Sequence, residues 1–209
     1  MSTEPTPQQP TSRELGILVV LGMLAVMWVL EIVDQVTSAD LDQYGIKPHE
    51  ADGLIGVATA PFLHAGFGHL IGNSVPFVVM GVAIALSGLA RVVGATAIVA
   101  LVGGLGTWLV GSSHTNHIGA SGIVFGYAAY LIARGFFSRN LLHFAVGVLV
   151  IAVYGTTLLF GLAPRDGISW QGHLFGAVGG VVAARLLDRR EARPKRRGDD
   201  ALASLPGVP

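Results

Sequence analysis

Six apolar stretches dominate this chain, and each has about the length that a helix needs to cross a lipid bilayer. The hydrocarbon core of a bilayer requires about 20 consecutive, mostly apolar residues per helix. The stretches cover residues 15–33, 69–89, 92–110, 121–137, 141–162 and 169–187. Of the 209 residues, 52% are hydrophobic and only 12% are charged, whereas a soluble domain carries about 25% charged residues. The chain is therefore predicted to be an all-α, polytopic membrane protein with six transmembrane helices.

The charges in the connecting loops predict the orientation of these helices. Lys and Arg accumulate in the short cytoplasmic loops of membrane proteins. The arginines of the short connections and the run after the last stretch fall on one side of the predicted bundle: Arg91, Arg134, Arg139 and residues 185–197. The loop 34–61, on the other side, carries five acidic residues against the single Lys47. Both termini are therefore predicted to be cytoplasmic.

The two ends of the chain differ from the membrane domain, which is predicted to cover residues 13–188. Residues 1–12 are rich in Pro, Thr, Ser and Gln, a composition typical of disordered segments. Residues 189–209 form a basic tail that is also predicted to be disordered. Its arginines either only fix the topology or also contact anionic lipid headgroups. The first stretch is interpreted as a retained anchor, because it exceeds the ~7–15 apolar residues of a signal peptide.

Polar and ionisable side chains gather at the predicted outer ends of three apolar stretches. Ionisable residues inside membrane helices are rare and mark functional sites. With the orientation given above, the following side chains lie at one depth: His64, His69 and Asn73 near the second stretch, Ser121 in the fourth and His173 in the sixth. Unrelated polar residues are not expected to coincide in this way. The sequence therefore predicts one site that is formed by three helices.

Ser121 has the local sequence of a nucleophile at the start of a helix. It lies in Gly119-Ala120-Ser121-Gly122, where the flanking glycines permit an irregular turn. The backbone N–H groups at a helix N-terminus favour a developing oxyanion. The alternative is a packing serine, because Gly122 and Gly126 form a face of small residues. A serine that meets a histidine at this depth would instead indicate nucleophilic chemistry.

His173 adjoins a smooth helix face, because Gly172, Gly176 and Gly180 recur every four residues. Small residues at this spacing let two membrane helices approach closely. Pairing with the glycine face of the fourth stretch would bring His173 to Ser121. The alternative is a histidine that is satisfied by a backbone carbonyl.

His69 and Asn73 are four residues apart and share one helix face. Both side chains can donate hydrogen bonds to an oxyanion. The alternative is a pair that holds loops together, which is the role expected for His64. A metal site formed by His64, His69 and His173 is a competing interpretation. No carboxylate lies at that depth and the chain has no cysteine, so no metal is predicted.

Together these motifs resemble those of the rhomboid family of intramembrane serine proteases. The similarity covers the six-helix core, residues 15–187. It rests on the segment 62–73, on Gly119-Ala120-Ser121-Gly122, and on Gly172-His173 with the glycines that follow. The first loop departs from the family pattern, because residues 54–57 read Leu-Ile-Gly-Val where many relatives carry a Trp-Arg pair.

The resemblance implies a role for each residue of the site. Ser121 would be the nucleophile and His173 the general base of a dyad without an acidic third member. The oxyanion hole would consist of the backbone N–H of Ser121 together with His69 and Asn73. Phe125, one turn after the serine, would stack on the imidazole of His173. The supporting positions are Gly119, Gly122, Phe125 and His64.

The expected function is that of an intramembrane serine endopeptidase that cleaves transmembrane proteins near the outer membrane face. Its partners would be single-pass transmembrane substrates and membrane lipid, with no cofactor, metal or nucleic acid. The expected location is a bacterial plasma membrane. One alternative is a non-catalytic relative that binds transmembrane helices. Another is a small transporter, which the clustering of polar residues toward one side of the membrane disfavours.

Overall fold

The computed structural model describes residues 9–37, 39–165 and 167–189. Within these ranges the chain is helical, and its one β-bridge joins Ile46 to His117. The α-helices are α1 (Ser12–Val36), α2 (Gly56–Thr59), α3 (Phe67–Ala85), α4 (Leu89–Val110), α5 (Ser121–Phe137), α6 (Leu141–Gly161) and α7 (Trp170–Arg189). Three short 3-10 helices, at Leu41–Tyr44, Asp52–Ile55 and Ala60–Phe62, complete the loop between α1 and α3.

Four of the described helices, α1, α3, α4 and α6, are long and apolar enough to cross a membrane. Helix α5 is apolar but shorter. The prediction of an all-helical chain is therefore confirmed for the described residues, and the four long apolar helices are consistent with a polytopic membrane bundle. The six spans and the cytoplasmic position of both termini stay predictions. Residues 1–8 of the predicted N-terminal segment and residues 190–209 of the predicted basic tail lie outside the described residues. The described part of them includes Ser12 and Arg189, which are the first residue of α1 and the last of α7.

The predicted helix limits differ most from the structure between the second and third apolar stretches. Helix α3 ends at Ala85 rather than near residue 89, and α4 begins at Leu89 rather than at residue 92. Gly88 has a φ of 105°, a conformation that glycine adopts without strain. Apolarity continues through this turn, so a hydropathy window does not detect it.

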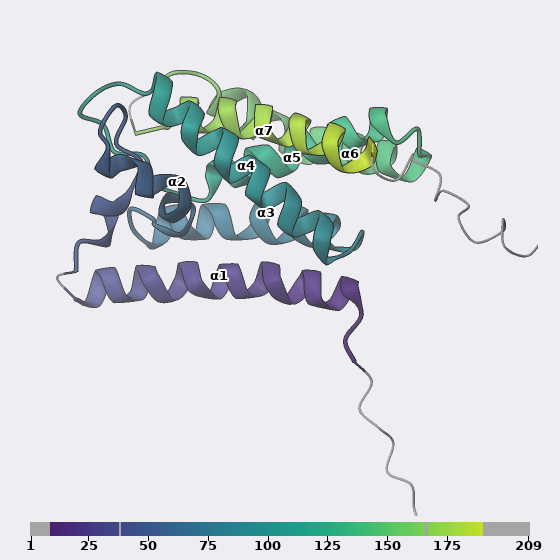
Figure 1. Cartoon of the computed structure of the whole chain (residues 1–209), viewed down its shortest axis with the longest axis horizontal. Coiled ribbons are helices and arrows are strands. Elements are labelled where there is room, and N and C mark those ends of the chain that lie inside the picture. Colours follow the sequence, from purple (N-terminus) through teal and green to yellow (C-terminus); the bar gives the residue numbers. More distant parts are fainter. Residues whose placement is uncertain (1–8, 38, 166, 190–209) are drawn as a thin grey trace, which may run out of the picture.

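The long helices run alongside one another, and the short helices collect at one end of the bundle (Figure 1). The first turn of α1 and the last turn of α7 lie at the opposite end (Figure 1). There the backbone N–H of Leu89 donates to the hydroxyl of Ser12 at 3.0 Å, which joins α4 to α1. The two ends of the bundle therefore differ in character, and the loop-rich end is the one that the charge pattern assigns to the outside.

The most extensive helix pair in the described structure is that of α5 and α7. A β-carbon on Gly176 would overlap the carbonyl oxygen of Gly122, and one on Gly180 would overlap that of Gly126. The two backbones thus touch along facing glycines, and the predicted glycine seam is confirmed. Because α5 begins with Ser121 and α7 carries His173, this seam fixes how closely the two residues approach.

A buried ionic cluster joins three helices at the end of the bundle away from the short helices. Asp188 of α7 pairs with Arg91 of α4, and also with the Nε of Arg134 of α5 at 3.4 Å. The side chain of Arg134 further donates to the hydroxyl of Ser87 at 2.6 Å. All three charged side chains are buried. Arg91 and Arg134, whose positions in the sequence predict the cytoplasmic side, therefore also hold helices together through ion pairs.

Candidate active site

Ser121 is the first residue of α5, and two backbone N–H groups of the turn before it donate hydrogen bonds that hold this turn. Gly119 has a φ of 113°, which the glycine permits, and its N–H donates to the carbonyl of Ala60 at 2.9 Å. The N–H of Ala120 donates to Nε2 of His64 at 3.2 Å. The first amides of a helix have no acceptor within the helix. The serine hydroxyl therefore stands beside a group of backbone donors.

His64 acts here as an acceptor, so its Nε2 carries no proton. The residue lies just before α3 and is 1% exposed. Burial, together with the neighbouring His69, lowers the pKa of His64 to about 4. A neutral ring is consistent with the hydrogen bond that it receives from Ala120. The predicted loop-holding role of His64 agrees with these contacts.

The imidazole of His173 lies between the hydroxyl of Ser121 and a backbone carbonyl. Its Nε2 is 2.8 Å from Oγ of Ser121, and its Nδ1 is 2.7 Å from the carbonyl oxygen of Gly161. A carbonyl oxygen only accepts hydrogen bonds. Nδ1 therefore carries the proton of the neutral ring, and the bare Nε2 accepts from the serine hydroxyl. This is the tautomer that a general base for Ser121 requires.

A cavity of about 1280 Å³ reaches both Ser121 and His173. Its wall also contains His69, Phe125 and the polar loop segment between α4 and α5. The hydroxyl and the imidazole are thus accessible from a partly polar space rather than sealed in the core. Such a space can admit water to a site within an apolar bundle.

His69 and Asn73 lie beside Gly119, two residues before the serine. A β-carbon on Gly119 would be 2.6 Å from Cε1 of His69 and 3.6 Å from Nδ2 of Asn73. Nδ1 of His69 accepts from the N–H of Ala65 at 3.4 Å, which leaves the ring proton on Nε2. Asn73 is 8% exposed, and its Nδ2 has no hydrogen-bond partner in the described structure. Both side chains thus offer a donor near the start of α5.

Several contacts of the site are not evident from the sequence. The carbonyl of Gly161 that orients His173 comes from the end of α6, and Ser169 and His117 meet beside the same cavity. His117 lies in the loop between α4 and α5. Its position four residues before Ser121 was the available signal. Among the described residues, no group of three His, Cys, Asp or Glu side chains is arranged to hold a metal ion.

The hydrogen bond between Ser121 and His173 thus lies inside a bundle of apolar helices. The family model described as "Rhomboid domain" matches residues 51–190, which is more than half of the chain. The chain belongs to the rhomboid family, and it is a multi-pass membrane protein.

Three bacterial relatives illustrate this membership. The chain is 44% identical over 214 residues to "Uncharacterized protein Rv1337" of Mycobacterium tuberculosis, covering 93% of this chain and 89% of the relative. It is 40% identical over 211 residues to "Uncharacterized protein ML1171" of Mycobacterium leprae, covering 93% and 83%. It is 28% identical over 184 residues to "Putative rhomboid protease YdcA" of Bacillus subtilis, covering 83% and 89%.

Proposed function

We propose that this protein is an intramembrane serine endopeptidase that cleaves transmembrane proteins near the outer membrane face. The observation that carries the proposal is the 2.8 Å contact between Oγ of Ser121 and Nε2 of His173. Membership of the rhomboid family supports the same reaction class. The substrates are single-pass transmembrane proteins, which reach the cavity from the surrounding lipid.

The reaction follows from the donors and acceptors around the serine. Nε2 of His173 takes the proton of Ser121 as Oγ attacks the carbonyl carbon of the scissile peptide bond. The negative oxygen that forms is stabilised by the backbone N–H of Ser121 and by the side chains of His69 and Asn73. The imidazolium then protonates the leaving amine. Water from the cavity hydrolyses the acyl-enzyme and restores the hydroxyl.

The carbonyl of Gly161 orients the imidazole of His173, which is one of the two roles of the acidic residue in a catalytic triad. It accepts the Nδ1–H of His173 at 2.7 Å and so fixes the tautomer. A neutral carbonyl stabilises an imidazolium less than a carboxylate does, since it carries only a partial charge. A two-residue mechanism without metal or cofactor is consistent with this geometry.

The proposed topology has six spans, two cytoplasmic termini and the plasma membrane of a bacterium as its location. Helix α5 has 17 residues and is therefore ~25 Å long, against a hydrocarbon core of ~30 Å. A helix of this length, anchored at its cytoplasmic end, places Ser121 below the outer surface. The cavity then connects that depth to the outer face.

Labelling with a fluorophosphonate probe in detergent tests the proposal. Wild-type protein should label, whereas Ser121→Ala and His173→Ala should not. Ser113→Ala is the matched control, because Ser113 is an exposed loop serine that bonds His49, and it should label like wild type. Wild-type protein that neither labels nor cleaves a model transmembrane substrate would contradict the proposal. It would favour a non-catalytic protein that binds transmembrane helices.

A further inference from the structure

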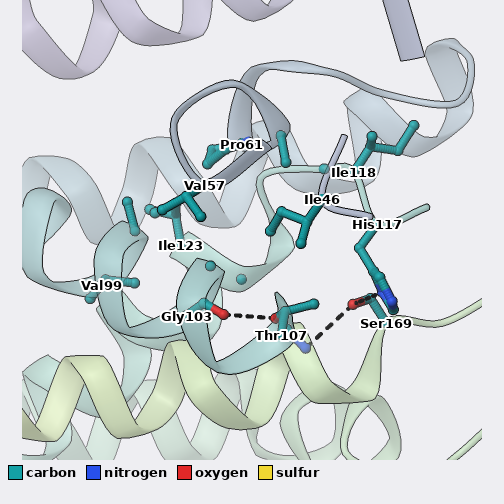
Figure 2. A pocket seen from close by; sticks show the side chains of 16 residues that line it. Ile46, Val57, Pro61, Val99, Gly103, Thr107, His117, Ile118, Ile123 and Ser169 are labelled. Carbon is teal, nitrogen blue, oxygen red and sulfur yellow. Dashed lines mark hydrogen bonds between the residues drawn. The ribbon is translucent and has the colours of Figure 1, made fainter. Parts of the chain in front are cut away.

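A second serine–histidine contact lies directly beside the first and repeats it in inverted order. Nδ1 of His117 is 2.7 Å from Oγ of Ser169, and Figure 2 shows the two side chains pointing at each other. His117 precedes Ser121 by four residues, and Ser169 precedes His173 by four. The same two chain segments are therefore joined twice. In the contact between Ser121 and His173, the segment 117–121 supplies the serine. In the contact between His117 and Ser169, the same segment supplies the histidine.

The hydrogen-bond partners of His117 define its tautomer. The hydroxyl of Thr115 donates to the carbonyl of Ser112 at 2.6 Å, so its oxygen can only accept from the ring. Nε2 of His117, 2.9 Å from that oxygen, therefore carries the ring proton. Nδ1 is then bare in the neutral ring and accepts from the hydroxyl of Ser169. Burial lowers the pKa of His117, which favours this neutral form.

Ser169 caps the helix that carries His173. Its Oγ accepts from the N–H of Gly172 at 3.3 Å, and its carbonyl accepts from the N–H of His173 at 3.1 Å. These are the side-chain and backbone bonds of an N-cap residue. A displacement of Ser169 is thereby transmitted to the backbone of His173, whose ring contacts Ser121.

The other side of His117 is attached to the outer loop. The N–H of His117 donates to the carbonyl of Ile46, and the N–H of Ile46 donates to the carbonyl of His117, both at 2.9 Å. The side chain of Asn116 also donates to the carbonyl of Asp42 at 2.6 Å. His117 thus connects the loop after α1 to the first turn of α7.

We propose that His117 is a positioning residue, which holds the N-cap Ser169 so that the imidazole of His173 stays within hydrogen-bond distance of Ser121. The inference rests on the proposed function, because it assigns a role in that reaction. Near this end the seam brings Gly122 against the carbonyl of Gly172, and glycines have no side chains that could prevent sliding of the two helices. There the hydrogen bond between His117 and Ser169 keeps the loop before α5 at a fixed distance from the turn that precedes His173.

Four single variants and one double variant test the role. The single variants are His117→Ala, His117→Gln, Ser169→Ala and the control His49→Ala, and the double variant combines the alanine changes at His117 and Ser169. Glutamine carries one donor and one acceptor at its end, as a neutral imidazole does. His49 lies in the loop after α1, to which His117 is bonded, and its ring also makes two hydrogen bonds, with Ser113 and with the carbonyl of Leu109. The measurements are the rate of fluorophosphonate labelling per folded protein, and kcat and KM for a transmembrane substrate.

His117→Ala and Ser169→Ala should label about 10- to 100-fold more slowly, because a small displacement of a catalytic group costs about this much. The loss should fall on kcat and leave KM unchanged. His117→Gln should recover most of the rate, and His49→Ala should label like wild type. The double variant of His117 and Ser169 should be no slower than the slower single variant, because both changes remove one interaction.

Two results would overturn the inference, and they are distinguishable. If the wild type labels and His117→Ala labels equally fast per folded protein, His117 only supports the fold, and the proposed function stands. If the wild type does not label at all, the proposed function fails and the inference fails with it. Should His117→Ala not fold, the comparison of His117→Gln with Ser169→Ala decides, since Ser169→Ala leaves the histidine in place.

Discussion

The rings of Phe125 and His173 stack in parallel, with centroids 4.0 Å apart and planes inclined by 5°. Phe125 follows Ser121 by four residues, so one face of α5 presents both the hydroxyl and the aromatic surface to the imidazole. The hydrogen bond to Gly161 fixes one edge of the ring, and the phenyl group fixes its plane. Rotation of the imidazole away from Ser121 is thereby restricted.

Replacement of Phe125 should slow the reaction without abolishing it. Aromatic pairs contribute about 0.5–1.5 kcal/mol beyond their buried area, which corresponds to about 2- to 10-fold in rate. Phe125→Ala should show this loss in fluorophosphonate labelling, and Phe125→Tyr should retain most of the rate. Phe144→Ala is the control, because Phe144 packs edge-on against Phe136 away from the site. Equal labelling by Phe125→Ala and wild type would contradict the positioning effect of the stack.

Asn73 should affect rate and stability in opposite directions. Loss of one oxyanion donor costs about 10²–10³ in the rate of serine proteases. The Nδ2 of Asn73 is buried and has no hydrogen-bond partner among the described residues, and removing such a group relieves a desolvation cost. Asn73→Leu should therefore lower kcat by about 10²–10³ while its thermal midpoint stays equal or rises. A large loss of thermal stability with unchanged kcat would show that Asn73 is only a structural residue.

The helices were predictable because apolarity is a local property of the sequence. The limits predicted for the fourth stretch, 121–137, coincide with those of α5. The pairing of glycine faces was predictable too, since a four-residue spacing defines a helix face. These two predictions together bring Ser121 and His173 into the same region.

The contacts that fix distances were not predictable, because they join segments far apart in the chain. The carbonyl of Gly161 is a backbone group and leaves no trace in the sequence. His117 and Ser169 are each unremarkable as single loop residues, and they form a contact only after α5 and α7 pack. Asp188 likewise appears as one charge near a basic tail, although the fold buries it against two arginines.

The seam between α5 and α7 should tolerate no side chain at its centre. Gly176→Ala would place a methyl group on the carbonyl oxygen of Gly122 and should force the helices apart. The variant should melt earlier, and its labelling per folded protein should be slower by an order of magnitude or more. Gly22→Ala is the control, because a β-carbon at Gly22 on α1 would meet no other described part of the protein within 4 Å, apart from its chain neighbours and the backbone of its own helix. A Gly176→Ala protein as active as the control would contradict the role of the seam.

Asp188 should contribute more to stability than any exposed acidic residue of the chain. Removal of one partner from a buried ion pair leaves an uncompensated charge and costs about 3–5 kcal/mol. Asp188→Ala should therefore lower the thermal midpoint strongly, and Asp188→Asn less so, because the amide oxygen still accepts from the arginines. The control is Asp52→Ala, which removes an exposed pair with Lys47 at 3.5 Å and should cost about 0–1 kcal/mol.

The protein should lose stability as Asp42 of the outer loop ionises. Burial, and then repulsion from Asp34, Glu31 and Asp40, raises the pKa of Asp42 from its ordinary 3.8 to about 6. Between these two values the folded state binds more protons than the unfolded state, so stability falls as pH rises. The stabilisation that comes from protonated Asp42 is fully present below its ordinary pKa of 3.8. It is lost once the pH passes its pKa of about 6 in the folded state.

Asp42→Asn removes this dependence, because an amide is neutral at every pH. Its thermal midpoint in detergent should equal that of the wild type near ~pH 4 and exceed it near ~pH 8. High salt should reduce the difference, since it screens repulsion between partly exposed charges. A scan of the midpoint against pH for both proteins checks the prediction. A difference that stays constant with pH, or a variant that is less stable at high pH, would contradict it, because ionisation of Asp42 would then not oppose folding.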